Sequence, residues 1–390
     1  MKKSLFAVAA LSAIAGAAQA QSSVTVYGIV DVGYIGINER AQAGNTTTKG
    51  TVNTFGSSAE QSSRLGFKGT EDLGGGSSAF FTLETGLNAD NSTLSAFNTR
   101  QAFAGYKKNG IGNVAFGTQY TPIHNAAGLT DPGQLNNMIG NVIFATTPQA
   151  NGNTAPFASG PSIGSGQTDA YTVRTSNTLT ATTDTFAGFQ GTALYTLNNQ
   201  NQTVTTTSAG GTTNNSGWGL GLNYTWNKLF VTANYQSFKS LSPTSSATTV
   251  TLYGQTGGTN VNDQQSYVAA TYDFGILKAY AQYVSRKATA ALNSGYYAKR
   301  TAEQIGVRSF ITPTIEAWAS GGMGKVNAYG AGEPNTSFTA WQLGSNYWLS
   351  KRTNLYAIYG QSQASNVTSV SGTQYSYGGS NYALGLRHTF

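Results

Sequence analysis

The sequence predicts an all-β protein: a transmembrane antiparallel β-barrel of about 16 strands. Charged residues make up only 9% of the 390 residues, against roughly 25% in an average soluble domain, while aromatic residues reach 12%. No internal stretch approaches the ~20 consecutive apolar residues that a transmembrane helix needs. Only helices and closed barrels satisfy every backbone polar group within lipid, so the barrel is the fold that remains.

The amino-terminal segment has the features of an export signal. Lys2 and Lys3 precede a short apolar stretch, which ends in small residues at Ala20. We therefore expect a signal peptide over residues 1–20, cleavage between Ala20 and Gln21, and one barrel domain over residues 21–390. Loss of the two lysines lowers the formal net charge of +7 by two, which leaves no nucleic-acid-binding signature. The chain has no cysteine and so relies on no disulfide.

Strands are indicated by apolar residues that alternate with small or polar ones, because successive strand residues point to opposite faces. In the segment GLGLNYTWN, Leu220, Leu222 and Trp226 share one face, and glycine, asparagine and threonine occupy the other. The same alternation marks three other segments. In the first strand the apolar residues are Val24, Val26, Val30 and Val32; near the end of the chain they are Trp341, Leu343, Tyr347 and Leu349; in the last strand they are Tyr382, Leu384 and Leu386. The apolar face is expected to contact lipid and the polar face the lumen.

The connections are of two kinds. Short ones hold turn formers, at residues 74–76, 109–110, 226–228, 273–275, 312–314 and 350–352. Long ones, rich in Ser, Thr, Asn and Gly, alternate with them at residues 38–62, 88–98, 120–170, 198–216, 237–263, 286–300, 325–338 and 361–380. About eight long and about seven short connections give about 16 strands, enough to enclose an aqueous channel.

A soluble β-sandwich is the alternative fold, because its strands also alternate and its turns are also rich in glycine. Its polar faces would carry Lys and Glu. Here they carry Gly, Thr and Asn. The composition therefore favours the barrel.

Four segments resemble the general porins of Gram-negative bacteria, in particular their beta-proteobacterial branch. They are the opening SSVTVYGIVDVG, the internal SSRLGFKGTEDLGGGSSAFFTLETGL and NTRQAFAGYKKNGIGNVAFGTQYTP, and the closing YALGLRHTF. The resemblance covers the chain after the signal segment. It implies an outer-membrane homotrimer in contact with lipopolysaccharide, a third loop folded into each pore, and Phe390 as the signal read by the barrel insertion machinery.

Strand parity indicates which charges face the pore. Arg64 and Lys68 alternate with Leu65 and Phe67, and Glu84 alternates with Phe81 and Leu83. By the same test Arg100 lies opposite Phe103, and Arg174 lies opposite Tyr171 and Val173. An arginine on the lipid side would cost ~2 to 4 kcal/mol near the midplane, which favours the lumen.

The resemblance places Arg64, Arg100 and Arg174 at the narrowest point, with Glu84 among them. Three permanent cations against one carboxylate predict a moderate anion preference. The competing interpretation is that each arginine pairs with a loop carboxylate and supports the barrel. The third loop, near residues 120–170, offers only Asp131 and Asp169 as acids. Asp131 either opposes the arginines or serves as a turn residue before Pro132 and Gly133.

An enzyme is not expected. The two histidines, His124 and His388, are far apart in the sequence, His388 shares the parity of the lipid-facing leucines, and no GxSxG motif is present. No spacing of metal ligands occurs, and no cofactor is expected. Passive diffusion of small hydrophilic solutes and ions is the predicted function. A surface adhesin and a substrate-specific channel remain the alternatives, although the loops lack aromatic and arginine clusters.

Overall fold

The computed structural model describes residues 23–90, 99–144, 170–202, 211–241, 250–252, 255–257, 261–290, 295, 297–329, 335–368 and 374–390. The predicted signal peptide, with its cleavage site at Ala20 and Gln21, lies outside these residues. Within them, no helix is both long enough and apolar enough to cross a membrane.

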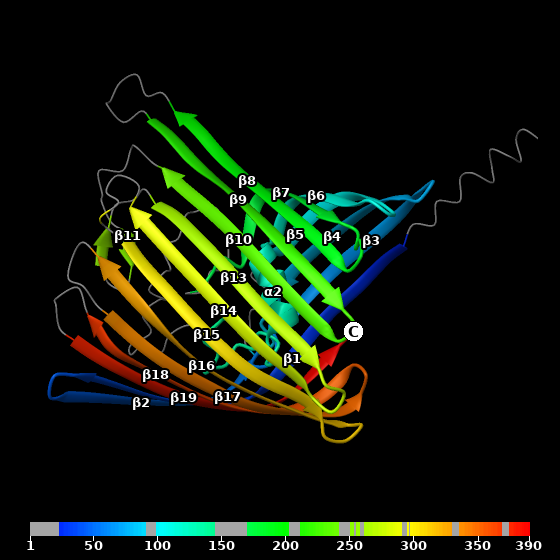
Figure 1. Cartoon of the computed structure of the whole chain (residues 1–390). Coiled ribbons are helices and arrows are strands. Elements are labelled where there is room, and N and C mark those ends of the chain that lie inside the picture. The colour runs from blue at the N-terminus through cyan, green and yellow to red at the C-terminus, as the bar shows by residue number, and fades with distance from the viewer. Residues whose placement is uncertain are drawn as a thin grey trace, which may run out of the picture.

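The chain is almost entirely β-sheet (Figure 1). The strands before helix α2 are β1 (Ser23–Ala43), β2 (Thr46–Ser57), β3 (Arg64–Gly74), β4 (Ser77–Gly86), β5 (Thr99–Lys108) and β6 (Gly112–Tyr120), and helix α2 itself covers Pro122–Thr130. The strands after it are β7 (Arg174–Thr183), β8 (Phe189–Gln202), β9 (Gly211–Trp226), β10 (Leu229–Leu241), the short pair β11 (Val250–Leu252) and β12 (Gln255–Gly257), β13 (Val261–Asp273), β14 (Lys278–Ala290), β15 (Tyr297–Phe310), β16 (Ile315–Tyr329), β17 (Asn335–Ser350), β18 (Thr353–Thr368) and β19 (Gln374–Thr389).

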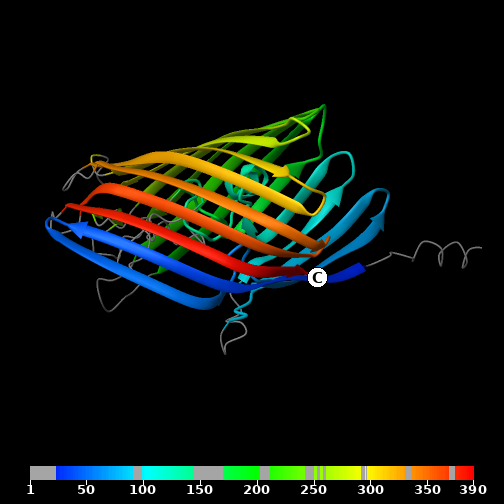
Figure 2. The same cartoon turned by 90° about the horizontal axis from the view of Figure 1, so that it is seen from below.

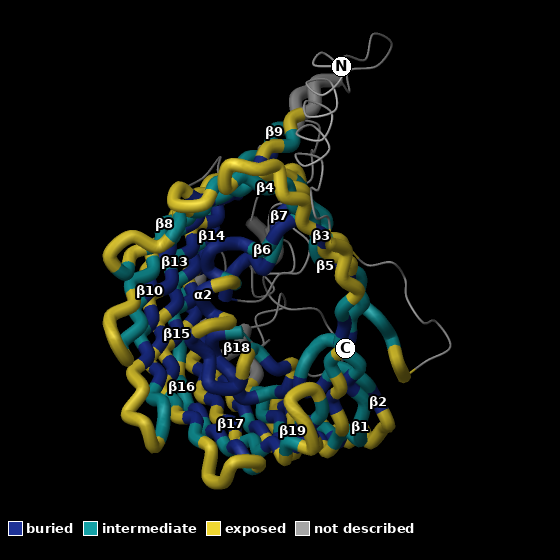
Figure 3. Tube along the Cα trace, turned by 90° about the vertical axis from the view of Figure 1, so that its right-hand side faces the viewer, coloured by how far each residue is buried: buried dark blue, intermediate teal, exposed yellow. Residues whose placement is uncertain are grey.

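The sheet closes on itself because the first strand pairs with the last. β1 pairs antiparallel with β19, from Ile29 opposite Thr389 to Ala43 opposite Tyr375. Its other edge pairs with β3 in its first part and with β2 in its second. β2 and β3 thus share one place in the ring, and the predicted 16-stranded barrel is confirmed. Figures 2 and 3 show the inclined strands from below and nearly along the barrel.

The predicted lipid-facing side chains are on the outer surface. Leu220 is 55% exposed and Leu222 is 49% exposed, and both alternate with inward glycines. The same parity exposes Val24, Val26, Trp341, Leu343 and Leu384. Because the period of a strand is two, one face of each strand forms an apolar outer band and the other forms the lumen wall.

Each predicted short connection is a tight turn. Gly74, Gly75 and Gly76 all have positive φ, which a residue without Cβ adopts readily. The expectation of a long loop over residues 38–62 is wrong: β1 runs to Ala43, a two-residue turn includes Gly44 (φ 53°), and β2 follows. A part of a strand that extends beyond the membrane has water on both faces, so no alternation of apolar residues marks it in the sequence. For this reason other strands also extend into segments that the sequence predicts to be loops.

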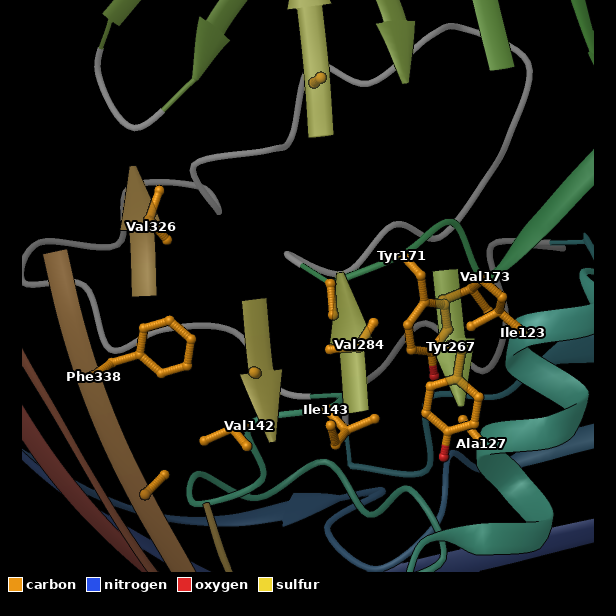
Figure 4. Close-up of a cluster of buried hydrophobic side chains, with 14 of the residues drawn as sticks. Ile123, Ala127, Val142, Ile143, Tyr171, Val173, Tyr267, Val284, Val326 and Phe338 are labelled. Carbon is orange, nitrogen blue, oxygen red and sulfur yellow. The ribbon is translucent and has the colours of Figure 1, made fainter. Parts of the chain in front are cut away.

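The main buried apolar cluster lies inside the barrel, around the third loop. Ile123 and Ala127 of α2 pack with Tyr171, Val173 and Tyr267, all at most 5% exposed (Figure 4). Helix α2 itself lies within the ring of strands (Figure 3). The barrel thus encloses a packed loop on one side, and this position brings the loop close to the charged wall described next.

Candidate functional site

An ion pair at the inner wall links β4 and β5. The Nε of Arg100 donates to Oε1 of Glu84 at 2.7 Å, and its second guanidinium nitrogen donates to the Tyr120 hydroxyl at 2.8 Å. The Tyr27 hydroxyl donates to the other carboxylate oxygen of Glu84 at 3.1 Å. Glu84 is 6% exposed. Its charge is therefore largely committed to Arg100, and the pair adds little net potential to the lumen.

Arg100 reaches this position through a β-bulge, which simple parity did not anticipate. Phe103 pairs with Thr82 and so shares the face of Glu84, whereas Tyr106 is exposed outside. Strict alternation would therefore point Arg100 outward. The register between β4 and β5 shifts between Glu84 and Thr85, next to Arg100, and re-aims its side chain. The premise drawn from Phe103 was wrong, while the contact with Glu84 places Arg100 at the inner wall.

Arg174 lies across from Tyr120 in the β6–β7 pair. Its guanidinium carbon lies 5.6 Å from the centre of the Tyr120 ring, within the range of a cation–π contact. Tyr171 and Val173, used above as outward-facing neighbours, are buried in the loop cluster instead. They precede β7, which begins at Arg174, so strand parity does not apply to them.

Arg64 begins β3 and has no carboxylate partner among the described residues. Its Nε donates to the carbonyl oxygen of Ser62 at 2.9 Å. The four ion pairs found in the described parts of the chain include neither Arg64 nor Arg174. Lys68, further along β3, is exposed, with its Nζ 5.3 Å from the Tyr27 ring centre. Within the described residues, the cluster thus contains one arginine paired with a carboxylate and two without such a partner.

Asp131 does not face these arginines, and Asp169, the other predicted loop acid, lies outside the described residues. Asp131 is 2% exposed and ends α2, where Oδ2 accepts from the Leu135 amide at 2.7 Å. Its Oδ1 accepts from the side chains of Asn141 (2.8 Å) and Gln304 (2.9 Å). Burial raises the pKa of this carboxyl to about 6, against the hydrogen bonds that lower it. The geometry is that of the turn residue rather than of a free opposing charge.

His124, in the first turn of α2, lies against the arginine cluster. Its ring centre is 4.5 Å from that of Tyr120. The helix starts here because the Thr121 side chain accepts from the His124 amide and Pro122 occupies the first turn. Burial, and then the field of Arg174, lowers the pKa of His124 to about 3. The imidazole is therefore neutral at physiological pH and adds no charge to the arginine cluster.

Inward glutamines hold the loop to the opposite wall. Gln304 of β15 accepts from the Val142 amide at 3.1 Å, and Gln342 of β17 donates to the carbonyl oxygens of Met138 and Ile139. Gln265 of β13 accepts from the Thr172 amide at 2.8 Å. Asn137 then reaches the segment before β3, where its amide donates to the Ala59 carbonyl at 3.0 Å. The described parts of the loop therefore run along the inner wall from α2 to the neighbourhood of Arg64.

Comparison with known proteins decides the family. The family model described as "Gram-negative porin" matches residues 7–367. The chain belongs to the Gram-negative porin family. With the closed barrel, this membership places the protein in the outer membrane, and it confirms the family resemblance seen in the sequence.

Among curated proteins, this porin is 36% identical over 201 residues to an outer membrane porin protein of Bordetella pertussis, an alignment covering 49% of this chain and 46% of that protein. It is 42% identical over 122 residues to outer membrane porin protein 32 of Delftia acidovorans, covering 31% and 33%. The chain thus spans less than half the length of these curated relatives. A solved anion-selective porin from Comamonas acidovorans superposes with a TM-score of 0.64, at 22% identity, covering 95% of this chain and 100% of that one.

Further buried charges in this porin were not anticipated from the sequence. Arg286 and Asp263, both 0% exposed, form an ion pair at 2.6 Å between β14 and β13. Arg308 pairs with Glu316 and donates to the Pro132 carbonyl at 2.7 Å. The sequence does indicate that these residues face the interior, since they alternate with outward-facing ones. It does not indicate which carboxylate each arginine pairs with.

The remaining predicted residues lie at the barrel seam. His388 is exposed, as its parity with the outward leucines predicted, and its Nδ1 is 2.9 Å from the Thr353 hydroxyl. The backbone of Phe390 exchanges two hydrogen bonds of 3.2 Å with Gly28 of β1. Its role as an assembly signal stays a prediction. Within the described residues, no group of three or more potential metal ligands is found.

Proposed function

We propose that this porin forms a water-filled channel for passive diffusion of small hydrophilic solutes and ions, with a moderate preference for anions. The observation that carries the anion preference is the charge balance of the wall cluster. Arg100 is neutralised by Glu84, whereas Arg64 and Arg174 have no carboxylate partner among the described residues. Two permanent cations in a confined throat attract anions and repel cations.

In its described part, the loop pairs no carboxylate with these arginines. Asp131 is buried and bound to Gln304 and Asn141, and His124 is neutral. The Comamonas acidovorans porin is described as anion selective, which agrees with the proposal for this chain. The chemistry is that of charged rings in a pore rather than of a reaction, so we propose a channel and not an enzyme.

Reversal potentials in planar bilayers test this proposal. In a KCl gradient, wild-type channels should prefer chloride, and the double variant R64Q/R174Q should lose that preference while it still conducts. The variant K228Q/K351Q, which changes two exposed lysines in short turns, serves as the matched control and should keep it. Absence of conductance steps from the folded wild type would refute the channel itself.

The proposed assembly is a homotrimer, as the family resemblance implies. The outer surface carries many large exposed apolar side chains, which lipid or neighbouring barrels can cover. Chemical cross-linking in intact outer membranes should give a ladder that ends at three chains. A ladder that ends at one chain would contradict this assembly.

A further inference from the structure

Four glycines of the inner wall lie directly beneath the third loop. They are Gly221 of β9, Gly306 of β15, Gly322 of β16 and Gly360 of β18. A Cβ added to each would meet, in the same order, an atom of Pro122, Pro132, Val142 and Ile139. We call Gly221, Gly306, Gly322 and Gly360 the seat glycines. The loop can lie this close to the wall because the residues beneath it have no side chain.

The closest approach is at Gly360, which is buried. The three atoms nearest to a Cβ on this residue are the carbonyl oxygen and carbon of Ile139 and Cγ of Gln342. The added Cβ would overlap that oxygen, since a carbon and a carbonyl oxygen need a separation of about 3.3 Å. At Gly306 and Gly322, a carbonyl oxygen of the neighbouring strand is also close, at 2.6 and 2.5 Å. At Gly360, by contrast, a side chain would displace the loop backbone rather than the wall.

The loop backbone is held tightly at this seat. The side-chain nitrogen of Gln342 donates to the carbonyl oxygens of Met138 at 2.7 Å and Ile139 at 2.8 Å. Gly140 follows with a φ of 115°, and a Cβ on it would overlap the carbonyl oxygen of Trp341. Loop and wall thus each provide a glycine where their backbones meet. The loop has no room to move further toward the wall.

The opposite side of this loop segment faces the lumen. Asn137 is exposed, and its side-chain nitrogen donates to the Ser58 carbonyl at 2.7 Å and to the Ser62 hydroxyl at 3.1 Å. The carbonyl oxygen of Ser62 accepts from Nε of Arg64 at 2.9 Å. Because the wall blocks the other direction, a displacement of Ile139 away from β18 would move the loop into the lumen beside Arg64.

We propose that Gly360 is a positioning residue that sets the size limit of the channel, while the other seat glycines support the rest of the loop. Without a side chain at this position, the loop backbone lies on the wall and the lumen stays open beside it. An alanine would hold the loop off the wall and narrow the lumen. Pore diameter is one of the properties that decide which solutes pass. The inference rests on the proposed function, because it concerns the size of the solutes that the channel admits.

Single-channel conductance, together with the swelling of proteoliposomes in neutral sugars of increasing size, tests this role. G360A should lower the conductance and exclude the largest sugar that passes through wild type, and G360V should do both more strongly. The matched control G321A adds the same methyl group to β16, where the nearest atom is Cβ of Trp341 at 3.8 Å, and should match wild type. An equal conductance and sugar limit in G360A and wild type overturns the proposal, as does an equal reduction in G321A.

A further comparison separates positioning from general damage to the barrel. The conductance of a single folded channel reports the aperture, whereas the heat-induced gel shift reports stability. The chloride preference of G360A should be at least that of wild type, because no charge changes and the loop moves toward Arg64. A lower transition temperature with an unchanged conductance of the folded channels would make Gly360 a structural residue only and overturn the proposal.

A second measurement applies if G360A fails to fold. The chain has no cysteine, so N137C/S62C places a single pair of thiols where the two native side chains lie 3.1 Å apart. The disulfide should form, and the channel should conduct equally with the bond intact or reduced, because the seat already holds the loop there. Absence of the bond, or a conductance that changes on its reduction, overturns the proposal.

These outcomes are distinct from those that test the proposed function. A wild-type channel that conducts without preferring chloride refutes the anion preference, whereas the sugar limit still tests the seat because the sugars carry no charge. Wild-type protein without conductance refutes the channel and, with it, this inference.

Discussion

The charge balance of the wall cluster makes a prediction of unusual sign: removal of an acid should strengthen anion selectivity. Glu84 holds Arg100 at 2.7 Å, so the two charges nearly cancel for an ion in the lumen. E84Q leaves Arg100 uncompensated and keeps the shape of the side chain. Among the described residues, the wall cluster then contains three arginines without a carboxylate partner in place of two.

The magnitude follows from the added charge. An ion ~6 Å from an uncompensated guanidinium gains or loses about 0.7 kcal/mol in a water-like dielectric. Since the anion gains this free energy and the cation loses it, the chloride-to-potassium permeability ratio should rise up to about tenfold. Screening by salt reduces the rise to roughly threefold at ~0.1 M.

Reversal potentials in a KCl gradient measure this ratio, and a double-mutant cycle controls for structural effects. R100Q leaves Glu84 uncompensated and should lower chloride preference, whereas E84Q/R100Q removes a neutral pair and should restore nearly the wild-type ratio. An E84Q channel with normal conductance and an unchanged ratio would refute the cluster as the source of selectivity. So would a double variant that differs from wild type as much as either single variant.

Further predictions concern the loop, the wall and the seam. Burial raises the pKa of Asp131 to about 6, so the protonated carboxyl stabilises the folded loop. This stabilisation should be complete below pH 3.8 and lost as the pH rises through 6. Open-channel noise should therefore be greater at about pH 7.5 than at about pH 4.5, and D131N should abolish that difference. D263N should destabilise the barrel by about 3 to 5 kcal/mol, because it removes the carboxylate that pairs with the buried Arg286. The double variant R286M/D263L should lose less stability. The heat-induced gel shift of the folded form measures the stability of both variants, and an equal loss of stability in the two would contradict the reasoning. F390A should lower the yield of folded barrel, and G28V should do so too, since a Cβ on Gly28 would lie 2.4 Å from the Phe390 ring; an unchanged rate of folding into vesicles would count against a role for this contact.

The candidate site was only partly accessible to sequence reasoning. Parity puts Arg64 and Glu84 on one face, as does the register of β3 with β4, because these strands are regular there and have exposed apolar neighbours such as Phe67 and Leu83. It failed for Arg100, where a bulge changes the alternation. Parity also could not decide whether Asp131 is a turn residue or an opposing charge. The sequence of a turn motif is the same whether its carboxylate faces water or accepts a hydrogen bond from a glutamine on a strand distant in sequence.

By itself, the sequence determined the barrel, the approximate strand number, the outward face and the family. These features depend on composition and on a period of two, which act locally and repeat along the chain. Only the tertiary structure decided that Glu84 neutralises Arg100, that Arg64 and Arg174 have no carboxylate partner among the described residues, and that inward glutamines bind the loop. These contacts join residues far apart in sequence, and their register is set when the sheet closes between β1 and β19.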